Sequence, residues 1–568
     1  MEKVMDTLHK RSVTSVVNII VFQSALVLLF SFSNLDIFHP ITWITNSLAK
    51  LASFSLWIIF IILCSLLAAL CGGLKNKILS GPHLYTNRFD RLRRVFSLST
   101  VFQACLHILI GIVVSCLYLA VIGRKYNSLH KECTFSAGLC VAEEKVFLIY
   151  SGAWSGIYVF LKNFFKCHPL RFPVIQQLVF LRLKAELIPS LKQAMKSSLL
   201  PCILCPILYF VNGNFALNVM CDIFNLTSED KLFSNLIDYL NFTLLFYMWL
   251  QTTVLIFSCE MVEHILNIFL TDLPEFPIAC QFGEANIGTL HEVLAAYKCP
   301  VIQNWGCLDL FSLAKNDPRR RKEIFALSQP GGHPNNWNAI RKECVQLMDN
   351  FVEQLNIVIS EMTNPQTESG GIPSTPVIPV PRMREMSPAM RNLCLIGQDT
   401  SLQYEPLNEE PFVGWHKIYE HVVLFAKSLI PPLLKTTRLN HMFDKFPDAQ
   451  LKLVFSNSLP VINAVQGLSF LVAASLTEDE YGVVQKDLNT IIIAIQQLKL
   501  TVDRAQKIGN FKRTQKNEQN DMQMKAALKA SLKRSLYKIC VTYRDHIQEL
   551  DLPFSVLNSL QVYLSFKE

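Results

Sequence analysis

The stretch LIDYLNFTLLFYMWLQTTVLIFSCEMVEHILNIFL, residues 236–270, decides how the chain is organised. Its first two thirds are apolar enough to lie in a lipid bilayer, and its last third has the pattern of an amphipathic helix. Long hydrophobic runs precede it, and shorter helical patterns follow it. We expect the spanning part to end near Ser258, because Glu260 and Glu263 are costly deep in lipid. One helix should then leave the bilayer and continue briefly into the cytosol.

Charged residues are scarce in the chain as a whole. Of its 568 residues, 51% are hydrophobic and 17% are charged, whereas a soluble protein carries about 25% charged residues. The net charge of +8 is modest, and its lysines and arginines cluster in short loops, which indicates membrane topology rather than nucleic-acid binding. The pattern predicts an all-α fold: a polytopic six-helix transmembrane domain followed by a cytosolic α-helical domain that a disordered linker interrupts.

Six runs are long and apolar enough to cross a bilayer, which takes roughly 20 residues. The fourth contains Lys162 near its end, where a lysine side chain can reach the membrane surface. The fifth contains two prolines and the pair Asn212-Gly213, so we expect a kinked helix. The predicted spans are residues 13–32, 51–71, 98–122, 146–165, 197–217 and 236–258, within a membrane domain of residues 1–270.

Lysine and arginine are concentrated at the N-terminus and in the loops after the second and fourth predicted spans. This bias predicts six spans with both termini on the cytosolic side. The other loops would then be lumenal. Asn225 begins a glycosylation sequon in one of them, although such triplets also arise by chance. Cys133 and Cys140 share another lumenal loop, in which they could pair.

Polar side chains within the predicted spans are uncharged or weakly basic. They are Asn18, Gln23, Gln103, His107 and Gln251. No span carries a central Asp, Glu, Lys or Arg, whereas an ion-coupled transporter usually needs such residues. We therefore interpret the five as hydrogen-bonding groups between helices. Gly152 and Gly156 form a small-xxx-small pair, which suits the close packing of two helices.

Helical patterns dominate the first cytosolic block, residues 271–362. They predict short helices over residues 290–297, 305–315 and 319–327 and a longer helix over residues 337–362. Asp317-Pro318 has the composition of a helix start, and residues 328–334 break the chain because Gly and Pro are dense there. Residues 363–411 are rich in Pro, Ser and Thr, which predicts a disordered linker.

The second cytosolic block, residues 412–568, is also predicted to be helical. Residues 467–475 are apolar nearly all round, which predicts burial. The sequence from Thr477 to Glu480 matches a capping box, so we expect a helix to start there and to continue through a heptad-like seam. An apolar stripe from Leu528 to Ile539 has most basic residues on its other side. It suits either an anionic membrane surface or a packed helix with a solvated basic face.

The sequence lacks the common catalytic, nucleotide-binding and metal-binding motifs. It contains no Walker A loop, Rossmann glycine pattern, HExxH zinc motif or nucleophile elbow. Cys202 and Cys205 have a metal-like spacing, but they lie in an apolar span without a second pair. The basic run at residues 319–322 could bind phosphate, lipid or nucleic acid, but such a run is usually a solvated helix face. We therefore predict no catalytic residue, no cofactor, no metal and no enzymatic activity.

Four stretches together resemble one family, and the last two are the specific ones. They contain Phe38, His39, Pro40 and Trp43; Phe172, Pro173, Gln176 and Gln177; Pro330, Gly331, Gly332, His333, Pro334 and Trp337; and Gly467, Thr477, Glu478 and Asp479. In order and placement they resemble the Ndc-type transmembrane nucleoporins, the nuclear division cycle proteins of the pore membrane. The linker at residues 363–411 looks shorter than in vertebrate-like members, so a partner motif of a longer linker is not carried over.

The resemblance implies a non-catalytic anchor of the nuclear pore complex, which tethers scaffold nucleoporins where the nuclear membranes fuse and supports pore assembly. The implied partners are the nuclear membrane bilayer, an aladin-like propeller protein, membrane-binding scaffold nucleoporins and other pore membrane proteins. No direct nucleic-acid partner and no small-molecule substrate is implied. The implied location is the nuclear envelope, with the N- and C-termini on the cytosolic or pore side.

The alternative function is that of a polytopic transporter or channel with a cytosolic helical regulatory domain. It would need ionisable residues or broken helices at the midplane of the membrane, and only the Pro-rich fifth span hints at these. An anchor would instead bind through its helical blocks. Trp337, Phe470, Tyr481 and Tyr537 are the aromatic candidates for that surface, although large aromatic residues are more often buried in the core.

Overall fold

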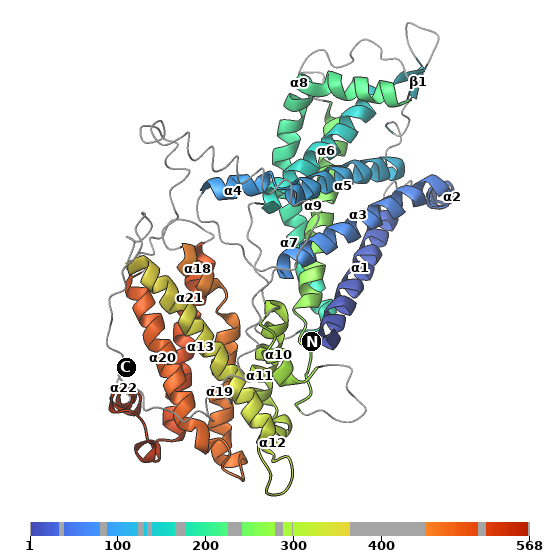
Figure 1. Ribbon diagram of the computed structural model, residues 1–568. Coiled ribbons are helices and arrows are strands. Elements are labelled where there is room, and N and C mark those ends of the chain that lie inside the picture. The colour runs from blue at the N-terminus through green and yellow to red at the C-terminus, as the bar shows by residue number, and fades with distance from the viewer. Residues whose placement is uncertain are drawn as a thin grey trace, which may run out of the picture. The chain divides into compact units, whose positions relative to one another are not determined.

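Helices form almost all of the structure, which confirms the predicted all-α class (Figure 1). The computed structural model describes residues 2–32, 39–79, 88–122, 126, 130–132, 139–164, 172, 177–224, 241–278, 288–297, 299–363, 449–508 and 518–565. Before residue 271 the helices are α1 (Glu2–Ser31), α2 (Pro40–Leu51), α3 (Phe54–Leu79), α4 (Arg88–Val95), α5 (Leu98–Ile122), α6 (Glu143–Phe164), α7 (Val179–Ser197), α8 (Leu199–Phe224) and α9 (Phe242–Leu270).

The elements after residue 270 are also helical. They are α10 (Leu290–Leu294), α11 (Pro300–Asn316), α12 (Pro318–Phe325), α13 (Asn335–Thr363), α18 (Ala449–Ser456), α19 (Leu459–Glu478), the 3-10 turn η2 (Gln485–Asp487), α20 (Leu488–Ile508), α21 (Glu518–Thr542), the 3-10 turn η3 (Ile547–Glu549) and α22 (Phe554–Leu564). Apart from the C-terminal end of α13, these elements belong to one compact unit of the chain.

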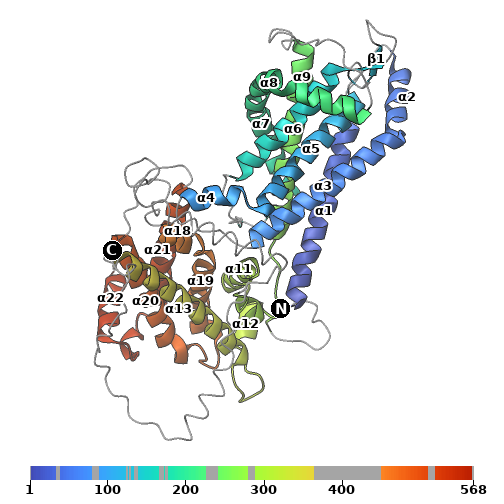
Figure 2. The ribbon, with the colours of Figure 1, turned by 45° about the horizontal axis from the view of Figure 1, so that its top comes forward.

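Helix α9, which contains most of the stretch that opened the sequence analysis, lies at the centre of the membrane half. It contacts each of α1, α3, α5, α6, α7 and α8 (Figures 1 and 2). Asn241 caps its start, since the Asn241 side chain accepts a 3.2 Å hydrogen bond from the amide of Thr243. The helix then runs unbroken past Ser258 to Leu270, as predicted. Almost every residue from Gln251 to Leu270 is buried, because neighbouring helices cover α9 on all sides.

Six helical segments are long and apolar enough to cross a membrane: α1 from Val4, α3, α5, Val179–Phe224, α9 and α19. The first five overlap the first, second, third, fifth and sixth predicted spans, although α3 begins three residues and α9 six residues later than predicted. The fourth predicted span falls on α6, which is less apolar. Helix α19 is apolar because it is a core helix of the cytosolic block, where it packs against α11 and α21. This agrees with the burial predicted for residues 467–475.

The fifth predicted span is a continuous helix. Helix α8 runs from Leu199 to Phe224 through Pro206, Asn212 and Gly213 without interruption. Ser198 joins it to α7 in helical backbone conformation. The backbone of α8 is therefore helical throughout, whereas the predicted kink and the transporter alternative stay predictions.

Helices α5 and α6 cross at very short range. A Cβ atom added to Gly152 would overlap the Ser115 hydroxyl and the carbonyl of Gly111, and one added to Gly156 would overlap the carbonyl of His107. The two backbones approach this closely because glycine has no side chain. The predicted packing role of Gly152 and Gly156 is confirmed.

A short antiparallel hairpin lies between α5 and α6 and was not predicted. Strand β1 (His130–Glu132) pairs with β2 (Leu139–Val141), with Lys131 opposite Cys140. Cys140 is disulfide-bonded. Cys133 lies outside the described residues, as do Asn225, Phe38, Pro173 and Gln176 among the other residues singled out from the sequence.

The first cytosolic block follows the predicted helices. Asp317 caps α12, since its carboxylate accepts from the amides of Arg319 and Arg320 at 3.0 and 3.2 Å. The long helix over residues 337–362 is α13. In the second block Gly467 lets α19 approach α11, because an added Cβ would stand 3.0 Å from Leu310 Cγ. Most of the predicted linker, residues 364–411, lies outside the described residues.

The predicted capping box is wrong. Thr477 and Glu478 close α19 instead of opening a helix, and the Thr477 hydroxyl donates back to Ala474. Asp479 stabilises the turn that follows α19. Its carboxylate accepts hydrogen bonds from the amides of Tyr481 and Val484 at 3.2 and 2.9 Å. A Thr-x-x-Glu pattern fits either end of a helix, and the apolar run before it already fills α19. The next helix, α20, starts at Leu488.

The apolar stripe of α21 faces the core of the cytosolic block. Leu528, Leu532, Leu536 and Ile539 are fully buried. Two of the lysines lie over aromatic rings of neighbouring helices: Lys538 Nζ is 3.9 Å from the centroid of Phe470, and Lys525 Nζ is 5.6 Å from that of Phe455. The packed-helix interpretation is therefore confirmed, and the membrane-surface alternative for this helix is wrong.

Candidate functional site

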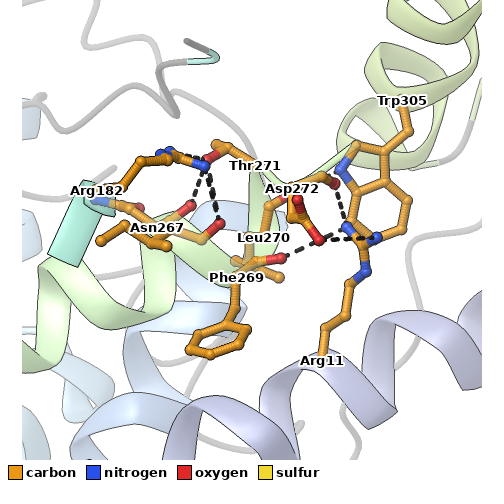
Figure 3. A network of polar contacts seen from close by, with 9 residues as sticks. Arg11, Arg182, Asn267, Phe269, Leu270, Thr271, Asp272 and Trp305 are labelled. Carbon is orange, nitrogen blue, oxygen red and sulfur yellow. Dashed lines mark hydrogen bonds and ion pairs between the residues drawn. The ribbon is translucent and has the colours of Figure 1, made fainter. Parts of the chain in front are cut away.

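The C-terminal end of α9 is held by donors from three other helices. The last carbonyl groups of a helix have no partner within it. Here three consecutive carbonyls are satisfied from outside (Figure 3). The contacts are Arg182 Nη1 to the Ile268 oxygen at 3.4 Å, Arg11 Nη1 to the Phe269 oxygen at 3.5 Å, and Trp305 Nε1 to the Leu270 oxygen at 2.7 Å. We call this set, together with Thr271 and Asp272, the α9 junction.

Arg11 lies between α1, the end of α9 and the cytosolic block. Its guanidinium carbon is 4.6 Å above the ring of Trp305, which is fully buried. It also donates to the Asp272 carbonyl and stands 3.9 Å from the Asp272 carboxylate. Stacking, hydrogen bonding and ion pairing together require the planar, multiply donating group of arginine, which a lysine would not replace.

Arg182 holds the other side of the same helix end. Its Nη2 donates to Thr271 Oγ1 at 2.7 Å, and this hydroxyl in turn donates to the Asn267 carbonyl at 2.7 Å. The C-terminus of a helix carries a partial negative charge, so two guanidinium groups there are electrostatically favourable. The two arginines therefore act at the α9 end itself, beyond their effect on membrane topology.

The chain leaving α9 is fixed as well. The backbone of Phe276 is held on both sides: its amide donates to Asp309 Oδ2 at 3.0 Å, and its carbonyl accepts from Arg320 Nη2 at 2.8 Å. Arg320 and Asp309 also form a two-pronged ion pair, with both contacts at 2.8 Å. Burial raises the pKa of Asp309 above its usual value, although the hydrogen bonds from Arg320 and the Phe276 amide oppose that shift.

A second charged contact lies further up α9. Lys162 Nζ of α6 is 2.8 Å from Glu260 Oε1 and 3.0 Å from Ser197 Oγ. Both charged side chains are largely buried. The sequence predicts that Lys162 reaches out to the membrane surface. In the structure it pairs with Glu260 inside the helix bundle instead. A lone charged Glu260 would be costly in this buried position, and the pairing with Lys162 offsets part of that cost.

The basic run at residues 319–322 is not a solvated face throughout. Arg320 holds the backbone of Phe276 in the segment that follows α9. Arg321 binds the carboxylate of Glu478 through contacts of 2.9 and 2.6 Å. Arg321 also donates to the Ala314 carbonyl at 3.1 Å. Since Glu478 ends α19, this pair joins the two cytosolic blocks.

Trp337, in one of the two most specific family stretches, contacts Asp487, which lies two residues after the other stretch. Trp337 is fully buried, and its indole Nε1 donates to Asp487 Oδ2 at 2.9 Å, while Arg341 Nε lies 3.1 Å from the same oxygen. The turn before Trp337 needs glycine, because Gly331 has a φ of 76°. It is closed by the Ser328 amide, which donates to the His333 carbonyl at 3.1 Å. These residues shape the fold rather than a reactive centre.

The remaining predicted site residues are dispersed. His39 occupies the N-cap position of α2 without a capping hydrogen bond from its side chain, Pro40 follows it, and Trp43 lies on the same helix. Phe172 and Gln177 flank residues outside the described part of the chain. Of the aromatic candidates, Trp337 is core and Phe470 is half-buried against Phe311 at 5.9 Å, whereas Tyr481 and Tyr537 are exposed. Cys202 and Cys205 are free thiols, and the described residues contain no cluster of three or more potential metal ligands.

Sequence reasoning missed the α9 junction because its members are far apart in the chain. In the sequence, Arg11 and Arg182 belong to the basic segments that indicate topology, and Trp305 begins one of the predicted helices. One signal was present: Asp309 is a lone carboxylate on the apolar face of a short helix, with Trp305 and Leu313. A buried charge in such a pattern requires a partner.

Sequence comparison now identifies the family. A family profile described as Nucleoporin protein Ndc1-Nup matches residues 6–561. The chain belongs to the Ndc1-Nup nucleoporins. Nucleoporin NDC1 of Xenopus laevis is 25% identical over 633 aligned residues, which cover 94% of this chain and 95% of that protein.

Two further Ndc1-Nup relatives align over similar lengths. Nucleoporin NDC1 of Homo sapiens is 25% identical, with 94% of this chain and 93% of that protein covered. Nucleoporin Ndc1 of Drosophila melanogaster is 27% identical, with 93% of this chain and 92% of that protein covered. The resemblance noted from the four sequence stretches is thereby confirmed, and the chain is a transmembrane nucleoporin of the nuclear pore.

Proposed function

We propose that this nucleoporin anchors the scaffold of the nuclear pore complex in the pore membrane and supports pore assembly by binding rather than by catalysis. The α9 junction carries the proposal. It joins the central membrane helix to the cytosolic block through buried, charge-assisted contacts, so the two halves are coupled stiffly. A load on the cytosolic block would then reach the bilayer through α9 instead of through a loose tether.

Six spans within residues 1–270 are supported by a parity argument. Arg11 near the start of α1 meets Asp272 just beyond the end of α9, so an even number of crossings lies between these two ends. Helices α1, α3, α5, α8 and α9 supply five. Helix α6 supplies the sixth, since it packs between α5, α8 and α9. The basic loops favour the cytosol for the side on which Arg11 and Asp272 meet, which gives cytosolic N- and C-termini.

The partners proposed for the cytosolic blocks are an aladin-like propeller protein, membrane-binding scaffold nucleoporins and other pore membrane proteins. No direct nucleic acid or small molecule is proposed. The side chains of Tyr481 and Tyr537 are exposed, and a tyrosine offers a binding partner a large apolar surface with one polar atom. The transporter alternative would rest on Pro206, Asn212 and Gly213 of α8, which is helical throughout.

The test is to express the tagged full-length chain in place of the resident protein and to map its neighbours by proximity labelling. We expect a punctate nuclear rim and labelled scaffold nucleoporins. A diffuse reticular pattern without scaffold partners would sink the proposal. A protease-protection assay on the same cells tests the topology, and a tag protected at either terminus would contradict cytosolic ends.

A further inference from the structure

A short helix next to the first predicted span carries an apolar stripe that no part of the described chain covers. Helix α2 has 12 residues, about 18 Å at 1.5 Å per residue, whereas the hydrocarbon core is about 30 Å thick. It is therefore too short to cross. Ile41, Ile44 and Leu48 are 76%, 42% and 53% exposed, and their spacing of three and four residues aligns them in one stripe.

The rest of α2 is fixed to the ends of three membrane helices. The ring of Trp43 meets that of Phe32, which directly follows α1, at 5.8 Å between centroids. The Leu51 carbonyl accepts from Trp57 Nε1 of α3 at 2.6 Å. Lys50 Nζ donates to the Val121 carbonyl near the end of α5 at 2.9 Å. The helix therefore lies where these three helices end, at the surface of the bilayer.

The neighbouring apolar surfaces indicate what covers the stripe. Phe54, the first residue of α3, is 80% exposed, and Leu29 near the end of α1 is 66% exposed. On membrane helices such side chains face lipid, and the α2 stripe lies beside the same two helix ends. The exposed Thr42 and Asn46 fall on the opposite face of α2. Two tryptophans, Trp43 and Trp57, are at the level that indole rings favour in membranes.

We propose that α2 lies in the plane of the membrane, with Ile41, Ile44 and Leu48 inserted among the acyl chains of the leaflet opposite the basic loops. The partner is lipid, bound through apolar contact. The helix has one basic residue, Lys50, and its amine is directed at a protein carbonyl. Binding therefore does not depend on anionic headgroups. This inference rests on the proposed anchoring function for its purpose: α2 fixes the depth of the α1–α3 corner in the bilayer.

The test places a photoreactive side chain on each face of α2 in the full-length protein. The variants are Ile44→benzoylphenylalanine on the stripe and the matched control Asn46→benzoylphenylalanine on the polar face. Each is reconstituted in nanodiscs of neutral phosphatidylcholine, and in nanodiscs with added phosphatidylserine, before irradiation and mass spectrometry. We expect lipid adducts several-fold more abundant at position 44 than at position 46, and equally abundant in both lipid mixtures.

Equal lipid adducts at both positions would overturn the inference. So would adducts at position 44 with protein instead of lipid, which would indicate a second copy of the chain. A strong requirement for phosphatidylserine would contradict the apolar mode of binding. The nanodiscs hold no other pore protein, so this result does not depend on the nuclear-rim experiment, and either can fail while the other succeeds.

Discussion

The membrane half and the cytosolic half of this nucleoporin are held together by different kinds of contact. In the membrane half the helices are joined by glycine contacts and by hydrogen bonds between neutral groups. Ser155 and Thr252 bond at 3.0 Å, Thr253 and Ser198 at 2.9 Å, and Gln251 donates to the Leu148 carbonyl at 2.7 Å. In the cytosolic half the joints are Arg320–Asp309 and Arg321–Glu478.

The difference follows from the solvent on each side. Apolar side chains gain little by leaving lipid for a helix interface, so close backbone approach and neutral hydrogen bonds hold membrane helices. In water the burial of apolar surface supplies most of the stability, and a few buried ion pairs fix which helices meet. The Lys162–Glu260 pair and the α9 junction are charged contacts at the boundary between these two regimes.

The largest expected effect is at the α5–α6 crossing. Gly152→Leu drives a side chain into the Gly111 backbone, which cannot move aside. We expect a loss of more than about 3 kcal/mol, above the common cost of overpacking. The measurement is thermal melting of detergent-purified protein. Gly72→Leu is the control, because nothing lies within 4 Å of its added Cβ. Equal melting temperatures for both variants would contradict the close crossing.

The next effect is at the exit from α9. Arg320→Met leaves Asp309 buried without its cation, and we expect a loss of about 3–5 kcal/mol at neutral pH. A carboxyl group with a raised pKa binds its proton more tightly in the folded state, so stability increases as the pH falls through that pKa toward the ordinary pKa of an aspartate. The defect should therefore shrink at acidic pH in a melting series.

The exposed Arg319 provides the control for that series. Arg319→Met removes a neighbouring arginine that has no buried carboxylate to satisfy, and it should change stability little. A defect of Arg320→Met that stays constant from neutral to acidic pH would show that Asp309 is not the group left unpaired.

A smaller effect is expected at the α9 junction. Arg11→Gln removes the stacking on Trp305 and the ion pair with Asp272, and we expect about 1.5–3 kcal/mol. Hydrogen–deuterium exchange should then rise over residues 260–276. Lys10→Gln is the control, since Lys10 is 74% exposed and pairs with the exposed Asp6. Protease-sensitive backbone at residues 260–267 in the unmodified chain would refute the stiff coupling.

The smallest effect concerns the turn before α13. Gly331→Ala places a side chain at a φ of 76°, where nothing lies within 4 Å, so only backbone strain opposes it. We expect about 1–2 kcal/mol. Asparagine tolerates this conformation better, so Gly331→Asn should lose less in the same melting assay. An equal loss for both would mean that the turn does not hold this backbone conformation.

The helices and the packing of α5 on α6 could be predicted because periodicity, run length and glycine spacing are local properties. Asp317 was correctly predicted as a cap for the same reason. Thr477 was not, because the same four residues fit the end of one helix or the start of the next. The interpretation of the polar span residues held for Gln23, which lies 3.5 Å from Ser258 of α9, and for Gln251. It was wrong for Asn18 and His107, which bond within their own helices.

The α9 junction could not be predicted, because no local pattern links its parts. A guanidinium at residue 11 finds its carbonyl at residue 269 only after the intervening helices have packed. Long-range pairs such as Arg321 with Glu478 are likewise decided by tertiary packing. The sequence alone shows which helices carry the positive charges. Counting charges cannot separate an arginine that sets topology from one that caps a helix.

The separation of Arg11 from its partners has a consequence for biosynthesis. It contacts residues 258 and 261 positions later in the chain. During synthesis α1 therefore enters the membrane long before Phe269 and Asp272 exist. Arg11 can form its contacts with them only after the later helices have been synthesised and inserted. A chain in which one hydrophobic run fails to insert would carry Arg11 and Asp272 on opposite sides of the bilayer. The junction then has no way to close, and its open carbonyls and unstacked tryptophan would distinguish a wrongly inserted chain from a correct one.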